Sequence, residues 1–180
     1  MSPSDSRGFT LIEILLVVFV IGTTLAVAVP AVSEAMRTYA LNNARQSIVS
    51  AVRSARYTAV SKNRTVRVRF NCPSANEFRI VEVVGSGVDS AADRCQSTAY
   101  PYPDKDAATA PDVDGPVMRL PQRTTFGTFQ DIEIDTNGRM TPLTGCPPCT
   151  PASGSATIRV KNGTNTRQII ITANGQISGS

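Results

Sequence analysis

The stretch "RGFTLIEILLVVFVIGTTLAVAVPAV", residues 7–32, decides how this chain of 180 residues is organised. From Phe9 to Val29 almost every side chain is apolar. As an α-helix these 21 residues would extend about 31 Å at ~1.5 Å per residue, enough to cross a hydrocarbon core of about 30 Å. Glu13 lies near the start of this run, although a carboxylate at the centre of a membrane helix costs roughly 2.5–3.5 kcal/mol, and less near an end. An interpretation of the segment therefore has to explain Glu13.

Two ordinary explanations each account for part of the segment. A secretory signal peptide would use Arg7 as its basic start and Ala26-Val27-Ala28 as its small-x-small cleavage site. The apolar run is longer than the usual stretch of about 7–15 residues, and Glu13 would lie inside it. A plain membrane anchor explains the length of the run and leaves Glu13 unexplained.

A third explanation gives Glu13 a partner. If the chain is cut between Gly8 and Phe9, Phe9 acquires a free amine, and Glu13 lies four residues further on. A charge in this position is expected to have a partner of opposite sign. In a bundle of identical helices that are staggered by a small axial shift, Glu13 of one subunit can meet the amine of the next.

The segment "RGFTLIEILLVV" resembles the class III leader and N-terminal helix of type IV pilins and type II secretion pseudopilins. Gly8, Phe9, Thr10, Leu11 and Glu13 match that motif position by position. The resemblance implies that a prepilin peptidase cuts after Gly8, that Phe9 is N-methylated, and that Glu13 guides subunit docking. It also implies a single-pass protein of the bacterial inner membrane with its globular domain outside the cytoplasm, which then joins a pilus or pseudopilus.

Two residues of the apolar run favour a helix kink. Pro30 falls where helices of this family are kinked, and Gly22 lies eight residues before it. Both residues also have an ordinary explanation, because glycine is common in membrane helices and proline is tolerated there.

Beyond Pro30 the pattern becomes that of an amphipathic helix. Apolar residues recur every three or four positions, which is one face of an α-helix, and most basic residues lie off this stripe. Ser61-Lys62-Asn63 is a suitable end, with a cation in the last turn. The expected stripe consists of Leu41, Ala44, Ile48, Val52, Ala55 and Ala59.

The remaining chain alternates with the period of two that is typical of strands. In "TVRVRF" the apolar side chains face one way and Arg67 and Arg69 the other. "TNGRM" and "ANGQI" contain Asn-Gly turns, which favour hairpins. Residues 85–116 are rich in Gly, Ser, Ala, Asp and Pro and are expected to form a long loop. The further expected strands are "EFRIVEVV", "TTFGTF", "DIEID", "ATIRV" and "RQIIIT".

A helix followed by mostly antiparallel strands predicts an α+β fold. We expect a leader at 1–8, the membrane and assembly half of the helix at 9–30, its amphipathic half at 31–63, and a β-rich domain at 64–180. The stretches "RSARYTAVSKNRTVRV", "FQDIEIDTNGRMTP" and "RQIIITANGQIS" resemble the GspH/FimT branch of pseudopilins, which implies a pilin-like fold and a minor subunit.

The chain has four cysteines, which allow three pairings. If the globular part is exported, disulfides are expected. We favour Cys72–Cys95, which would anchor the long loop, and Cys146–Cys149 within "GCPPCT". A redox pair at Cys146–Cys149 and a four-cysteine zinc site are weaker alternatives, because the first lies among prolines and the second needs two close pairs.

The charged residues and the lack of histidine give little support to catalysis or metal binding. The formal net charge is +4, and the absence of histidine removes the commonest general base, so we expect no catalytic residue, no cofactor and no metal. "DVDG" alone does not complete a calcium loop. A run of basic residues could bind phosphates or be solvated or paired with acids: Arg53, Arg56, Lys62, Arg64, Arg67 and Arg69.

Nucleic acid is not an expected partner. Relatives linked to DNA uptake have a Gly-Arg-x-Arg motif in the last hairpin, and here Gln176 and Ser178 stand in place of both arginines. The sequence thus predicts a non-enzymatic filament subunit whose partners are a prepilin peptidase, other pilins or pseudopilins and the inner membrane. DNA-binding minor pilin and secreted enzyme remain as alternatives.

Overall fold

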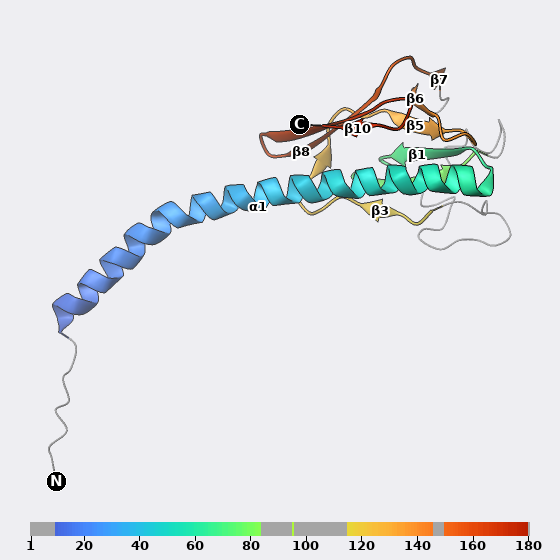
Figure 1. Cartoon of the computed structure of the whole chain (residues 1–180). Helices are drawn as coiled ribbons and strands as arrows, with labels where there is room; N and C mark the ends of the chain where they lie inside the picture. Colours follow the sequence, from blue (N-terminus) through green and yellow to red (C-terminus); the bar gives the residue numbers. More distant parts are fainter. Residues whose placement is uncertain (1–9, 84–94, 96–114, 146–149, 180) are drawn as a thin grey trace, which may run out of the picture. The chain divides into compact units, whose positions relative to one another are not determined.

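The computed structural model describes residues 10–83, 95, 115–145 and 150–179 (Figure 1). The chain forms two compact units, Met1–Thr38 and Tyr39–Ser180. The first described element, helix α1 (Leu11–Lys62), contributes its first part to one unit and its second part to the other. The expected long N-terminal helix is therefore confirmed.

The second part of α1 packs on β-sheet through one apolar stripe. All six residues of the expected stripe, from Leu41 to Ala59, are buried, and Val49 and Ala51 join them. Four of the eight buried helix residues are alanines, whose small side chains let a helix axis come close to its neighbour. The helical period of 3.6 residues per turn thus predicts the buried face of α1 correctly.

The end of α1 lies where the sequence suggests. Asn63 follows Lys62 with φ of 51°, a left-handed conformation that asparagine tolerates better than most residues. The Arg64 amide donates to the Ala59 carbonyl at 3.0 Å, which satisfies one of the last helical oxygens.

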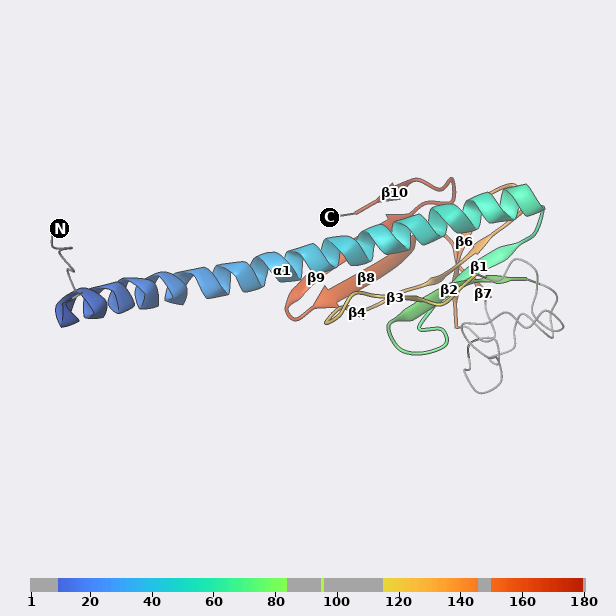
Figure 2. The same cartoon turned by 90° about the horizontal axis from the view of Figure 1, so that it is seen from below.

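The described strands of the globular unit form two antiparallel sheets (Figures 1 and 2). Neighbouring strands pair in antiparallel register in both sheets, so the α+β arrangement is as expected. The six-stranded sheet runs in the order β3 (Met118–Arg119), β2 (Glu77–Glu82), β1 (Val66–Phe70), β5 (Asp131–Ile134), β6 (Met140–Thr144), β7 (Thr150–Pro151). The four-stranded sheet runs in the order β10 (Ile177–Ser178), β9 (Asn165–Ile171), β8 (Ala156–Asn162), β4 (Thr125–Phe126).

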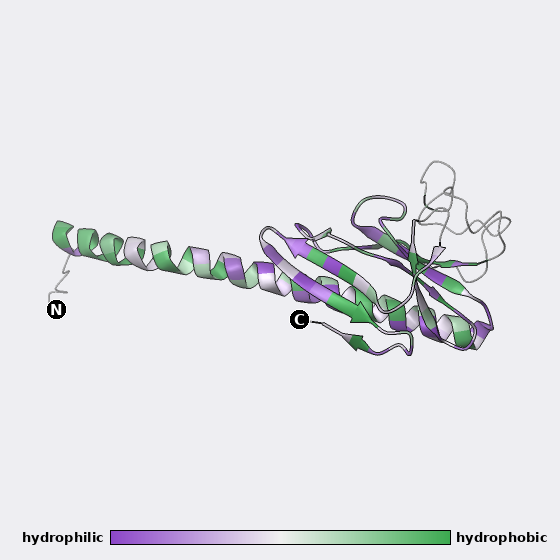
Figure 3. Ribbon diagram, turned by 90° about the horizontal axis from the view of Figure 1, so that it is seen from above, coloured by the Kyte–Doolittle hydropathy of each residue, from purple (hydrophilic) through white to green (hydrophobic). Residues whose placement is uncertain are grey.

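Alternation along the strands builds one core between the helix and the sheets. Val66, Val68 and Phe70 of β1 are buried in the same cluster as Ile158 and Ile169 of the second sheet. The hydropathy colouring shows polar and apolar residues alternating along β8, whereas β9 changes from polar residues at its start to isoleucines at its end (Figure 3). Phe70 also meets Phe126 of β4 edge-on with ring centroids 5.3 Å apart, so an aromatic contact joins the two sheets.

Several strands of the structure were not predicted from the sequence pattern. A two-residue strand such as β3, β7 or β10 is too short to show a period of two. "TTFGTF" forms only the short strand β4. Strand β6 was not among the expected strands, although the Asn-Gly turn of "TNGRM" before it favours a hairpin. The Pro142 carbonyl of β6 accepts from the Ala152 amide at 2.8 Å, so the residue takes part in the sheet through its oxygen.

A buried ion pair lies on the face of β1 that points away from α1. Arg69 Nε donates to Asp131 Oδ2 at 3.0 Å, and both side chains are only 7% exposed. Asp131 Oδ1 also accepts from the Phe70 amide at 2.9 Å. Burial raises the pKa of the Asp131 carboxyl, and the hydrogen bond from Phe70 and the charge of Arg69 oppose that rise.

We expect Asp131→Ala to lower the free energy of unfolding by about 3–5 kcal/mol, because Arg69 would remain buried without its carboxylate. Asp131→Asn retains an oxygen for the Phe70 amide and should cost less. Thermal unfolding of the full chain in a nonionic detergent measures both variants, and equal stability of Asp131→Ala and the parent protein would contradict the role of this pair.

The same pair predicts a pH dependence. Because the folded pKa of Asp131 lies above its usual 3.8, the folded protein binds the proton more tightly than the unfolded chain. The contribution of this carboxyl to stability is therefore fully present below 3.8 and is lost as pH rises through the folded pKa. Relative to Asp131→Asn, the parent protein should gain stability as pH falls through this window, which unfolding curves at a series of pH values can check.

Candidate functional site

Thr10 caps the first turn of α1. The Glu13 amide donates to the Thr10 carbonyl at 3.1 Å and to Thr10 Oγ1 at 3.3 Å, and the Ile14 amide donates to the same carbonyl at 3.3 Å. Thr10-Leu11-Ile12-Glu13 has the Thr-x-x-Glu spacing of a capping box, a signal that sequence reasoning missed. Glu13 also places a negative charge in the first turn, which the helix dipole favours.

The first part of α1 presents a continuous apolar surface. By length and composition α1 could cross a membrane, and none of its most apolar window is buried. Surfaces of this extent on a protein mark contact with a membrane or with other proteins. The large exposed side chains of this part are Leu11, Ile12, Ile14, Leu15, Leu16, Val17, Val18, Phe19, Val20, Ile21, Leu25, Val27, Val29, Val32 and Met36.

The hydroxyl groups of this segment are bonded within the helix itself. Thr23 Oγ1 and Thr24 Oγ1 both donate to the Val20 carbonyl, at 3.0 and 2.7 Å, and Ser33 Oγ donates to the Pro30 carbonyl at 2.8 Å. Such internal bonds are what a helix needs where no water is available.

Glu13 differs from these hydroxyls. It is the single charged residue between residues 10 and 33, its side chain is exposed, and its carboxylate bonds to no donor among the described residues. Gly8 and Phe9 lie outside the described residues, so the partnership between Glu13 and the Phe9 amine stays a prediction. The helix continues through Gly22 and Pro30, and a kink at either residue also stays a prediction.

The structure contains the expected Cys72–Cys95 disulfide, which ties the turn after β1 to a residue 23 positions further along the chain. Because both thiols are used in this bond, the alternative of a four-cysteine zinc site is wrong. Cys146 and Cys149 lie outside the described residues.

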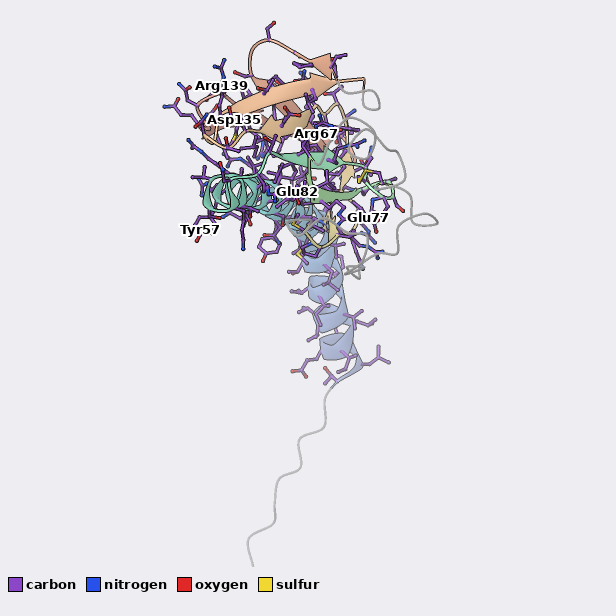
Figure 4. All side chains as sticks on the ribbon, turned by 90° about the vertical axis from the view of Figure 1, so that its right-hand side faces the viewer. Tyr57, Arg67, Glu77, Glu82, Asp135 and Arg139 are labelled. Carbon is purple, nitrogen blue, oxygen red and sulfur yellow. A yellow bond between two sulfur atoms is a disulfide. The ribbon has the colours of Figure 1, made fainter. Side chains whose placement is uncertain are left out.

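Three of the six residues of the basic run are paired with carboxylates. Arg67 donates to Glu133 at 2.8 Å, Arg69 is paired with Asp131, and Arg64 lies 3.5 Å from Glu82. These arginines pair with carboxylates on strands β2 and β5, and Figure 4 shows Arg67 and Glu82 within the sheet region. Strand pairing thus neutralises much of a run that in sequence contains no acid.

Residues 3–29 match the family model described as the prokaryotic N-terminal methylation motif. The chain carries this methylation motif. The matched residues include Gly8, Phe9 and Glu13, and the match extends into α1 as far as Val29.

Two further comparisons concern the whole chain. A comparison with curated proteins found no match. Among solved structures, the minor pseudopilin EpsH from the Type 2 Secretion System of Vibrio cholerae is similar, with 12% sequence identity over 75% of this chain and 91% of that chain and a TM-score of 0.44.

The cap on α1 gives a local prediction. Thr10→Ala removes the hydroxyl oxygen, which is one of the two acceptors of the Glu13 amide, and should cost about 1 kcal/mol of helix-end stability, whereas Thr10→Ser should retain the hydroxyl. Hydrogen exchange of the Glu13 amide in detergent micelles should therefore accelerate roughly fivefold in Thr10→Ala alone. Equal acceleration in both variants would show that the hydroxyl does not form the cap.

Proposed function

We propose that this chain is a minor pilin-like subunit that a prepilin peptidase cuts after Gly8, that is then N-methylated on Phe9, and that assembles through α1 into a type II secretion pseudopilus or a type IV pilus. The observation that carries this proposal is the methylation motif over residues 3–29, because it runs directly into a fully exposed apolar helix. A place near the filament tip belongs to the same proposal.

The parts of the chain have separate tasks in this proposal. Residues 1–8 are the leader in the cytoplasm, and residues 9–30 hold the precursor in the inner membrane until extraction. Residues 31–63 are the half of the helix on which the β-rich domain at 64–180 is built. This domain lies outside the cytoplasm and makes the specific contacts with other subunits, so the protein acts by assembly and not by catalysis.

Cleavage supplies the charge that Glu13 needs. While the Gly8–Phe9 peptide bond is intact, residue 9 has no charge, and the Glu13 carboxylate has no cation nearby in sequence except Arg7. Hydrolysis creates an amine that is cationic at neutral pH, and N-methylation keeps that charge. A bundle in which each Glu13 meets the amine of the next subunit then satisfies both groups in an apolar environment.

Mass spectrometry of the mature N-terminus tests the processing step. We expect N-methyl-Phe9 in cells that have a prepilin peptidase and the intact precursor in cells that lack it. A mature chain that begins at Val29 would instead identify an ordinary signal peptide and refute the proposal.

Substitution of Glu13 tests docking. Glu13→Ala and Glu13→Gln should strongly reduce incorporation into sheared filaments, because the amine of the neighbouring subunit would lose its counter-charge. Glu13→Asp keeps a carboxylate and should retain part of the incorporation. Glu34→Gln is a matched control, because Glu34 is an exposed acid of the same helix whose partner is Arg37 of its own chain. Normal incorporation of Glu13→Ala, measured beside normal membrane levels, would rule out the docking role.

A further inference from the structure

Two turns of the globular unit share one design. They are the β5–β6 turn (Asp135–Arg139) and the β9–β10 turn (Thr172–Gln176). In each turn a glycine with positive φ donates its amide to the first residue's carbonyl at 2.9 Å: Gly138 to Asp135 and Gly175 to Thr172. The first residue's side chain then accepts from the amide of the last residue, at 2.9 Å in one turn and 3.1 Å in the other.

The two turns are fixed to each other although they belong to different sheets. The Met140 amide, directly after the β5–β6 turn, donates to the Ala173 carbonyl in the β9–β10 turn at 2.9 Å. This backbone hydrogen bond holds Gly138 and Gly175 close to each other. The sequence signal for each hairpin was present in "TNGRM" and "ANGQI", but nothing in the sequence places the two turns side by side.

Arg56 of α1 lies between these glycines. A Cβ added at Gly138 would fall 2.9 Å from Arg56 Nε, and one added at Gly175 would fall 2.5 Å from Arg56 Nη1. The guanidinium of Arg56 therefore lies directly against both glycines, while its side chain as a whole is exposed.

The guanidinium of Arg56 forms no ion pair within the described part of the chain. Neither Arg56 nor Arg139 forms an ion pair or a side-chain hydrogen bond with any described residue. The one acid of the turn, Asp135, uses its Oδ1 for the amides of Asn137 and Arg139. Figure 4 shows Asp135 and Arg139 close together at one edge of the globular unit.

The arginines open onto a depression of about 380 Å³, which falls in the range of roughly 300–1,000 Å³ that is typical of small-molecule sites. Its walls combine two cations, two amide side chains and turn backbone. The lining residues are Arg56, Asn137, Gly138, Arg139, Ala173 and Asn174.

We propose that this depression binds a phosphate-type oxyanion, either free phosphate or the phosphate of a small phosphomonoester. The planar guanidinium of Arg56 presents paired N–H donors that match two oxygens of such a group, and Arg139 supplies the second positive charge. The amide groups of Asn137 and Asn174 can donate to the remaining oxygens. Because Arg56 and Arg139 are the two cations that line the described depression, we expect it to hold a single phosphate group and not a chain of phosphates.

Titration of the full chain in nonionic detergent, at constant ionic strength and pH 7, tests this site. The midpoint of thermal unfolding should rise with inorganic phosphate and then saturate, because a ligand of the folded state stabilises through one site. General exclusion of phosphate from the protein surface would give an unsaturated rise that is the same in all variants. Broadening of the ³¹P resonance of phosphate provides a second measurement that does not depend on stability.

Variants identify the residues. Arg56→Gln and Arg139→Gln should each weaken phosphate binding by about tenfold or more. The affinity of Arg56→Lys should lie between those of Arg56→Gln and the parent, because lysine keeps the positive charge but lacks the paired N–H donors of the guanidinium. Arg159→Gln, which removes an exposed arginine of β8 outside the depression, should bind like the parent. Each variant is first checked for an unchanged unfolding midpoint without phosphate.

The outcomes are distinct. Saturable binding that Arg56→Gln weakens and Arg159→Gln leaves unchanged supports the site. Tighter binding of glycerol 3-phosphate than of inorganic phosphate assigns the phosphomonoester as ligand, and equal binding assigns the free anion. No saturation, an unaltered affinity in Arg56→Gln, or an equal loss in Arg159→Gln overturns the proposal, and none of these results bears on filament assembly.

Discussion

The close approach of the second part of α1 to the two sheets is the contact on which the globular unit depends. Ala44, Ala51, Ala55 and Ala59 bring the helix backbone near the strands, and larger side chains such as Ile48 fill the space between. Because interiors are packed at nearly crystalline density, a stripe of this composition fixes the position of the helix within narrow limits. The positions of both Asn-Gly turns relative to Arg56 follow from that contact.

The sequence predicts the elements whose pattern is long enough to have a period. The buried face from Leu41 to Ala59, strand β1 and strand β2 all follow from spacing alone. A strand of two residues is too short to show a period. Strand β6 contains Pro142, which is unfavourable in a strand, and β6 forms through its pairing with β5 and β7. The cap at Thr10 could have been recognised, since the Thr-x-x-Glu spacing is a known signal.

The sites depend on the sequence in different ways. The N-terminal motif is predictable because it lies in consecutive residues, and the match of residues 3–29 to the methylation motif agrees with that expectation. The charges of the globular unit are not predictable in this way. Arg67 and Arg69 meet Glu133 and Asp131 only through pairing of β1 with β5, across more than sixty residues of chain. Arg56 pairs with no acid among the described residues, and Asp135 of the neighbouring turn uses its Oδ1 for the amides of Asn137 and Arg139.

The hydroxyl bonds within α1 have a consequence for how its first part can change surroundings. Thr23, Thr24 and Ser33 keep their hydrogen-bond partners wherever the helix goes, because donor and acceptor lie on the same turn. Transfer from lipid to a bundle of similar helices therefore breaks none of these bonds, and lipid tails and leucine side chains are almost equally apolar. In the assembly that we propose, the free energy of that transfer then depends on packing and on Glu13, the single charged residue between residues 10 and 33.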